Sequence, residues 1–203
     1  MTSPERHYRH LKAGDPAPRF SLPSWPEGRG SLGQYLGRHQ VLLVFQGRYF
    51  LSGTSSVDAA IARVVITLSA LSADADRFEA ANTRILAVAR ETPQRQRWMS
   101  EYLQLRFPVL SDEAGDVGQA YGLLPENRWA GSSDGYDRSC VVMLLDRSGV
   151  MRWTAVANLI ASPRASVPVA HAEEWDRIEP FRLGSPEVLQ TEALLTATDL
   201  SPR

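Results

Sequence analysis

The sequence predicts an α/β domain in which a mixed β-sheet is covered by helices on both faces. Two apolar, β-branched runs, 41–45 and 83–89, have the composition of central strands that are buried on both sides. Helix-period patterns follow both runs, as in a partly parallel sheet. With 203 residues, the chain is long enough for one well-cored domain and short for two. We expect an arm at 1–13, the domain at 14–156, and an extension at 157–203 whose final helix packs on the same domain.

The remaining elements are predicted by capping, turn and periodicity signals. Thr92-Pro93 is typical of a helix start, with a cap residue before a first-turn proline. Asp146 to Gly149 is typical of a tight hairpin turn, and Ser72 to Asp74 is a candidate break in a long helix. In the first half of the chain we expect a strand at 20–22, a turn at 25–30, a short helix at 31–37, the strand 41–45, helix over 56–82 and the strand 83–89. A helix from 92 follows, with Trp98, Met99, Tyr102 and Leu103 on its apolar side. After it we expect a strand at 107–112, a helix at 116–121, a hairpin over 141–156, and a last helix from 185 to about 196. This order fits a thioredoxin-like layer architecture.

Composition excludes several classes of function. The net charge is −1 and the arginines are scattered, so we expect neither a nucleic-acid partner nor an anionic membrane surface. No apolar run approaches a membrane span and the N-terminus lacks the apolar core of a signal peptide, which predicts a cytoplasmic protein. Cys140 is the only cysteine, which excludes an intrachain disulfide and a thiolate zinc cluster. No metal or cofactor is expected.

Five segments occur in an order that is characteristic of one known family. They are GDPAPRFSL at 14–22, VLLVF at 41–45, Trp98 ahead of FPVLSD at 107–112, AYG at 120–122, and DRSGVMR at 146–152. Together they resemble the peroxiredoxin family, in the alkyl-hydroperoxide-reductase and thiol-specific-antioxidant group. The resemblance covers residues 14–152 and implies a thioredoxin fold, with homodimer formation as a frequent property.

The resemblance also implies a site, but one of its residues is missing. In that family a thiolate in the first turn of the helix after the central strand attacks the peroxide, aided by a nearby Thr and by an Arg from a later strand. Counting from Phe45 places the family's cysteine at Thr54, or at Ser55, Ser56 or Val57 if the loop is longer; none of these is a cysteine. A hydroxyl stays protonated near neutral pH and forms no sulfenate. The family's ordinary peroxidase mechanism is therefore not expected.

The hydroxyl residues that stand there have two compatible roles. Thr54, Ser55 and Ser56 are good N-caps for the following helix. Free backbone N–H groups and hydroxyls at a helix start also accept a carboxylate, a phosphate or another oxyanion. Arg48 and Tyr49 lie on the same loop and are candidate walls of such a pocket.

Arg138 and Cys140 are the candidates from the later strand. Arg138 resembles the family's pocket arginine, although it lies farther from Asp146 than the family's spacing, and ungapped counting places Cys140 there instead. Two residues apart on a strand, both side chains are expected to face the loop that carries Thr54. Cys140 is then either an activated nucleophile or a small core residue within an apolar run.

The leading hypothesis is a peroxiredoxin-like protein whose vacated thiol site binds, or chemically transforms, a small oxygen-rich or anionic molecule. Thr54 and adjacent N–H groups would hold the oxyanion and Arg138 would supply positive charge. One alternative is a one-cysteine thiol peroxidase that uses Cys140. Another is a non-catalytic interaction module, such as a homodimer.

Overall fold

A seven-stranded mixed sheet forms the centre of the molecule, with the strand order β2-β1-β5-β4-β3-β6-β7. The computed structural model describes residues 11–47, 57–123, 140–157, 159–165 and 188–200. The strands of this sheet are β1 (Ser21–Trp25), β2 (Gly28–Ser31), β3 (Gln40–Gln46), β4 (Thr83–Ala89), β5 (Val109–Ser111), β6 (Cys140–Leu145) and β7 (Met151–Ala157). The prediction of a central mixed sheet is confirmed.

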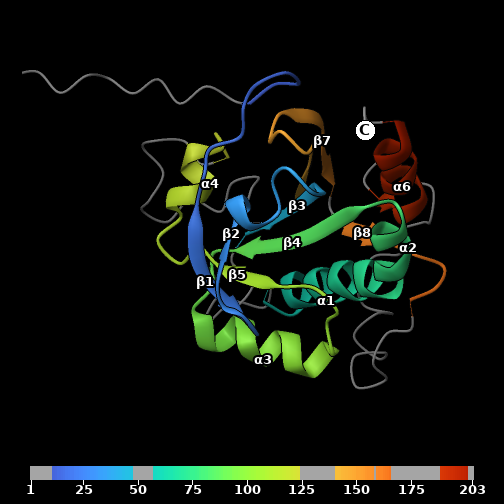
Figure 1. Ribbon diagram of the computed structural model, residues 1–203. Helices are drawn as coiled ribbons and strands as arrows, with labels where there is room; N and C mark the ends of the chain where they lie inside the picture. The colour runs from blue at the N-terminus through green and yellow to red at the C-terminus, as the bar shows by residue number, and fades with distance from the viewer. Residues whose placement is uncertain (1–10, 48–56, 124–139, 158, 166–187, 201–203) are drawn as a thin grey trace, which may run out of the picture.

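Helices cover both faces of the sheet, and Figure 1 shows α1 and α3 close together on one side. The helical elements are η1 (Leu32–Gln34), α1 (Val57–Ala73), α2 (Ala75–Ala80), α3 (Pro93–Leu103), α4 (Asp116–Ala120) and α6 (Thr191–Leu200). One apolar core lies between the sheet and α1, α2, α3 and α6, and a second lies between the opposite face and η1 and α4. The thioredoxin-like layer prediction therefore holds on both faces.

Strand β3 lies inside the sheet between β4 and β6, and all seven of its residues are buried. It runs parallel to β4, from Gln40 opposite Thr83 to Gln46 opposite Ala89, and antiparallel to β6, where Gln46 lies opposite Cys140. Because side chains alternate along a strand, its five apolar residues supply both cores. Leu42 and Val44 belong to the core beneath α1, whereas Val41, Leu43 and Phe45 belong to the other core.

The buried carboxylate of Asp74 ties the C-terminal part of the chain to the junction of α1 and α2. It accepts hydrogen bonds from Ser162 Oγ, Thr191 Oγ1, Arg77 and Arg164. Burial alone would raise the pKa of Asp74, but these hydrogen bonds outweigh it and lower that pKa below its ordinary value. Two short parallel strands, β8 (Leu159–Ala161) and β9 (Val188–Gln190), complete the attachment.

Several predicted boundaries are confirmed. The long helix breaks where Ser72 to Asp74 predicted it, because α1 ends at Ala73 and α2 begins at Ala75. Thr92 caps α3 by accepting a hydrogen bond from the backbone N–H of Arg95. The hairpin of β6 and β7 turns at Asp146, whose carboxylate accepts hydrogen bonds from the backbone N–H groups of Ser148 and Val150.

The predicted apolar side of α3 is wrong in part. Trp98 and Tyr102 are 48% and 37% exposed, and their rings stack on each other with centroids 5.1 Å apart. Met99 is buried as predicted, and the other two buried positions of the helix are the polar Gln96 and Ser100. Gln96 tolerates burial because its side-chain amide donates to the carbonyl oxygen of Leu110 at 3.1 Å.

Two other expectations also need correction. The last helix begins at Thr191, directly after β9, and not at residue 185. The sequence did not predict strand β8, and β5 is shorter than the predicted strand 107–112. Strand β8 pairs with β9, which is distant in the chain.

Candidate functional site at the carboxyl end of β3

Of the predicted site residues, the structure describes Cys140. The other predicted site residues lie outside the described residues; they are Arg48, Tyr49, Thr54, Ser55, Ser56 and Arg138. Strands β3 and β4 are parallel and α1 connects them, so the chain leaves β3 at its carboxyl end and starts α1 near that end. The 17-residue α1 thus directs the positive end of its dipole toward this edge of the sheet.

Cys140 is the first residue of β6 and lies between Gln46 of β3 and Ala157 of β7. Its side chain belongs to the core beneath α1, and the residue is only 4% exposed. Burial raises the pKa of the Cys140 thiol to about 12, although backbone hydrogen bonds at Cys140 and Ala157 lower it in part. The thiol is therefore protonated near neutral pH, which agrees with the interpretation of Cys140 as a core residue.

Gln46 is the functional candidate that the sequence interpretation missed. It ends an otherwise apolar run, faces the same side as Cys140, and is 3% exposed. Its side-chain nitrogen, Nε2, is buried and has no hydrogen-bond partner among the residues that the structure describes. An unsatisfied buried donor costs about 1–3 kcal/mol, so an amide at this position needs an acceptor. The signal for Gln46 in the sequence was that a polar residue ends an otherwise apolar, buried strand.

At the neighbouring ends of β4 and β5, three buried polar residues, Glu91, Ser111 and Asp112, already have partners. Glu91, just after β4, forms an ion pair with Arg95 at 3.0 Å. Ser111 Oγ donates to the carbonyl oxygen of Glu91. Asp112, just after β5, accepts hydrogen bonds from the backbone N–H groups of Val117 and Gly118 at the start of α4. Glu91, Ser111 and Asp112 thus already have partners, whereas Gln46 Nε2 has none among the described residues.

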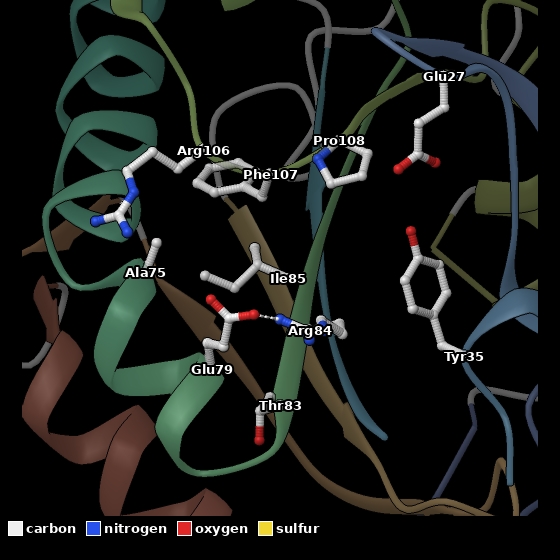
Figure 2. Close-up of a pocket in the computed structure, with 10 residues that line it drawn as sticks. All are labelled: Glu27, Tyr35, Ala75, Glu79, Thr83, Arg84, Ile85, Arg106, Phe107 and Pro108. Atoms are coloured by element: carbon white, nitrogen blue, oxygen red, sulfur yellow. Dashed lines mark hydrogen bonds and ion pairs between the residues drawn. The ribbon is translucent and has the colours of Figure 1, made fainter. Parts of the chain in front are cut away.

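Figure 2 shows a separate pocket near the amino end of β4, with a volume of about 260 Å³. Its centre contains an ion pair between Glu79 and Arg84. Tyr35 lies across the pocket on the same side as Glu27, and burial together with the Glu27 charge raises the pKa of Tyr35. Because the pocket presents both signs of charge and its central pair is already formed, its chemistry favours no particular ligand.

The described residues contain no group of three or more His, Cys, Asp or Glu side chains that could hold a metal ion. None of the helices in the described ranges is long and apolar enough to cross a membrane.

Comparison with known proteins identifies the family. A sequence profile described as the AhpC/TSA family matches residues 13–154. The chain belongs to the AhpC/TSA family. It is 28% identical over 140 residues to the protein named peroxiredoxin Bcp of Escherichia coli strain K12, an alignment that covers 68% of this chain and 81% of that one. The resemblance predicted from the five sequence segments is thus confirmed at the level of the peroxiredoxin family.

Solved structures of family members share the fold. Peroxidoxin BcpB from Mycobacterium tuberculosis matches with a TM-score of 0.58 at 17% identity, over 81% of this chain and 94% of that one. Peroxiredoxin Q from Xanthomonas campestris matches with a TM-score of 0.57 at 16% identity, over 88% and 89% of the two chains. At these identities the structural matches support the fold alone. The chemistry of the site depends on the residues of this chain.

Proposed function

We propose that this AhpC/TSA family protein has lost the peroxidatic cysteine and binds a small oxygen-rich or anionic molecule at the carboxyl end of β3. The sequence contains one cysteine, and it lies on β6 and not between β3 and α1. The family's thiol chemistry requires an accessible thiolate near the start of that helix. The position therefore keeps the scaffold of a peroxide site without its nucleophile.

The observation that carries this proposal is the unpartnered amide of Gln46. A buried N–H donor is satisfied by an acceptor atom, and oxygen is the common acceptor of small metabolites. The N-terminus of α1 adds positive potential on the same side of the sheet. Together these features favour an oxygen-bearing ligand, and they favour an anion over a cation.

The residues predicted from the sequence complete the proposed site. The hydroxyls of Thr54, Ser55 and Ser56 would donate to the ligand while capping α1. Arg138 would supply the charge that pairs with an oxyanion, since an arginine forms two parallel hydrogen bonds with a carboxylate or a phosphate. Arg48 and Tyr49 are the proposed walls of the site.

The rival proposal is peroxidase chemistry at Cys140. It requires the Cys140 thiolate to attack one peroxide oxygen, which forms a sulfenate and releases water or an alcohol, after which an external thiol returns the cysteine to its reduced state. With a pKa of about 12, only about one thiol in 10⁵ is ionised at pH 7. Burial also blocks the approach of a peroxide to the sulfur. Both properties disfavour this route.

Titration with sodium acetate and with sodium sulfate tests the proposed site. We expect saturable shifts in the backbone amide resonances of Gln46 and Cys140, which report on the carboxyl end of β3. Gln46→Met removes the donor at nearly constant volume and should weaken binding by about fivefold or more. Thr54→Val and Arg138→Gln should also weaken it.

Gln40→Met is the matched control, because Gln40 lies on the same strand and the same face but at the opposite end. It should leave the shifts of Gln46 and Cys140 unchanged. The proposal fails if neither anion shifts these resonances, or if Gln46→Met, Thr54→Val and Arg138→Gln all bind as well as the wild type.

A further inference from the structure

A second pocket lies at the opposite end of β3, where the C-terminal helix packs on the sheet. It has a volume of about 470 Å³, within the range of about 300–1,000 Å³ that is typical of small-molecule sites. Its described walls come from the start of β3, the turn between α2 and β4, the turn between β6 and β7, and α6. Figure 1 shows α2 and α6 next to each other at this end of the molecule. Helix α6 lies beyond residue 154, where the family match ends.

Gln40 contributes an unsatisfied acceptor to this pocket. The residue is 2% exposed, and its side-chain Nε2 donates to the carbonyl oxygen of Thr198 on α6 at 3.3 Å. That hydrogen bond fixes the orientation of the amide. The other amide atom, Oε1, is buried and has no hydrogen-bond partner in the described part of the chain. A ligand that satisfies Gln40 must therefore offer an N–H or O–H donor.

Arg147 contributes an unsatisfied cation. The pocket contains two arginines and no acidic residue among its described lining residues. Arg77 is already compensated, since it pairs with Asp74 at 3.2 Å and with Glu192 at 2.7 Å. Arg147 has no carboxylate partner among the described residues, and its Nε is buried without a hydrogen-bond partner. An anionic group would satisfy Arg147 through charge-assisted hydrogen bonds.

We propose that this pocket binds a small hydroxylated anion, with its phosphate or carboxylate group on Arg147 and its hydroxyl donating to Gln40 Oε1. One molecule with both groups satisfies the two unpaired side chains together, whereas a simple anion or a neutral alcohol satisfies one. The rest of the wall includes Leu195 and the alanines of the α2–β4 turn, which suit a short carbon backbone between the two groups. The site is independent of the one proposed at the carboxyl end of β3.

A matched set of small molecules tests this assignment at pH 8, where a phosphate monoester carries no acidic proton of its own. Glycerol 3-phosphate carries both groups, propyl phosphate lacks the hydroxyls, and glycerol lacks the anion; glycerate replaces the phosphate by a carboxylate. Binding is followed through the backbone amide resonances of Gln40, Asn82 and Thr198. We expect saturable shifts with glycerol 3-phosphate or glycerate, about fivefold weaker binding of propyl phosphate, and no saturation with glycerol. The tighter of the two hydroxylated anions identifies the anionic group.

Two substitutions separate the two roles. Arg147→Gln should weaken binding of the hydroxylated anion by about tenfold, whereas Arg29→Gln, which alters an exposed arginine on β2 outside the pocket, should leave it within about twofold. Gln40→Met should make glycerol 3-phosphate bind no better than propyl phosphate, because the acceptor for its hydroxyl is gone.

The proposal is overturned if neither hydroxylated anion shifts the pocket resonances. It is equally overturned if propyl phosphate binds as tightly as glycerol 3-phosphate, or if Arg147→Gln retains wild-type affinity. Should a variant lose the dispersed amide spectrum of a folded protein, the wild-type comparison of glycerol 3-phosphate with propyl phosphate decides the question.

Discussion

Both ends of β3 carry a buried glutamine, but the side-chain atom that lacks a hydrogen-bond partner differs between them. Gln40 begins the strand and Gln46 ends it, both are buried, and both face the core beneath α1 and α6. They lie roughly 20 Å apart along the strand. At the amino end the unpartnered atom is an acceptor, Oε1, and at the carboxyl end it is a donor, Nε2. The two ends therefore select ligands with opposite hydrogen-bonding groups.

The difference comes from what covers each end. Helix α6 supplies the carbonyl oxygen of Thr198, which accepts a hydrogen bond from Gln40 Nε2, while Gln40 Oε1 has no partner among the described residues. No described residue does the same for Gln46. The two proposed sites thus lie at opposite ends of one strand of the family's shared fold, and the site at the amino end also involves α6 of the C-terminal extension. A residue type alone does not define a site, since the partner that it already has decides what it can still bind.

The largest effect is expected from cutting the attachment of the extension, which should disrupt the amino end of β3 and spare the carboxyl end. Asp74→Ala removes a buried carboxylate that accepts four side-chain hydrogen bonds. We expect the free energy of unfolding, measured by urea denaturation, to fall by about 3 kcal/mol. The amide resonances of Gln40 and Thr198 should move more than those of Gln46.

Asp76→Ala is the control for this substitution, because Asp76 lies in the first turn of α2, just after Asp74, and contacts the same Arg164 but is exposed. Asp76→Ala should lower the free energy of unfolding much less than Asp74→Ala does. An equal loss from both variants would show that the buried carboxylate does not hold the extension in place.

Lowering the pH should remove part of the stabilisation that Asp74 contributes to the folded state. The folded-state pKa of Asp74 is lower than its ordinary value near 4, so its contribution is complete above about pH 4 and is lost as the pH falls through the lower folded-state pKa. The free energy of unfolding of the wild type should therefore drop more steeply below pH 4 than that of Asp74→Asn. Parallel pH profiles for the two proteins would contradict this assignment.

A smaller and opposite effect is expected at the carboxyl end. Gln46→Met replaces an unsatisfied buried amide by an apolar side chain of similar size, which should raise the free energy of unfolding by about 1 kcal/mol. If Gln46→Met is more stable than the wild type but binds the ligand more weakly, Gln46 serves binding at a cost in stability. A loss of more than about 1 kcal/mol would mean that Gln46 already has a satisfied structural role.

The smallest effect is expected from the same substitution at the other end. Gln40→Met relieves the unpaired Oε1 but also removes the hydrogen bond to Thr198, so the two contributions nearly cancel. The free energy of unfolding should change by less than about 0.5 kcal/mol, which is the usual size of a substitution without a dominant mechanism. If Gln40→Met and Gln46→Met shift stability by the same amount, the contrast between the two ends is wrong.

The sequence predicted the parts of the fold that depend on local pattern. The buried run 41–45 is apolar on both faces, as a central strand requires, and the small residues at 72–74 interrupt a helix whose stripe resumes at Phe78. The sequence left two interpretations of Cys140 open, and the structure buries it among apolar neighbours. These features need no knowledge of distant contacts.

The features that the sequence did not predict depend on partners far away in the chain. Gln96 lies inside α3 because its side chain reaches the backbone of Leu110, and Trp98 is exposed as a result. Strand β8 forms only because β9 pairs with it. Gln46 became a candidate only when its lack of a partner was visible, which no local pattern reveals.

The central claim is that the protein works without a reactive thiol. The most direct test measures hydrogen peroxide consumption with dithiothreitol for the wild type beside Cys140→Ser, with dimedone added in parallel to trap a sulfenic acid. Both proteins should consume peroxide no faster than dithiothreitol alone, and dimedone should label neither. A protein-dependent rate that disappears in Cys140→Ser, together with labelling of the wild type, would contradict the account.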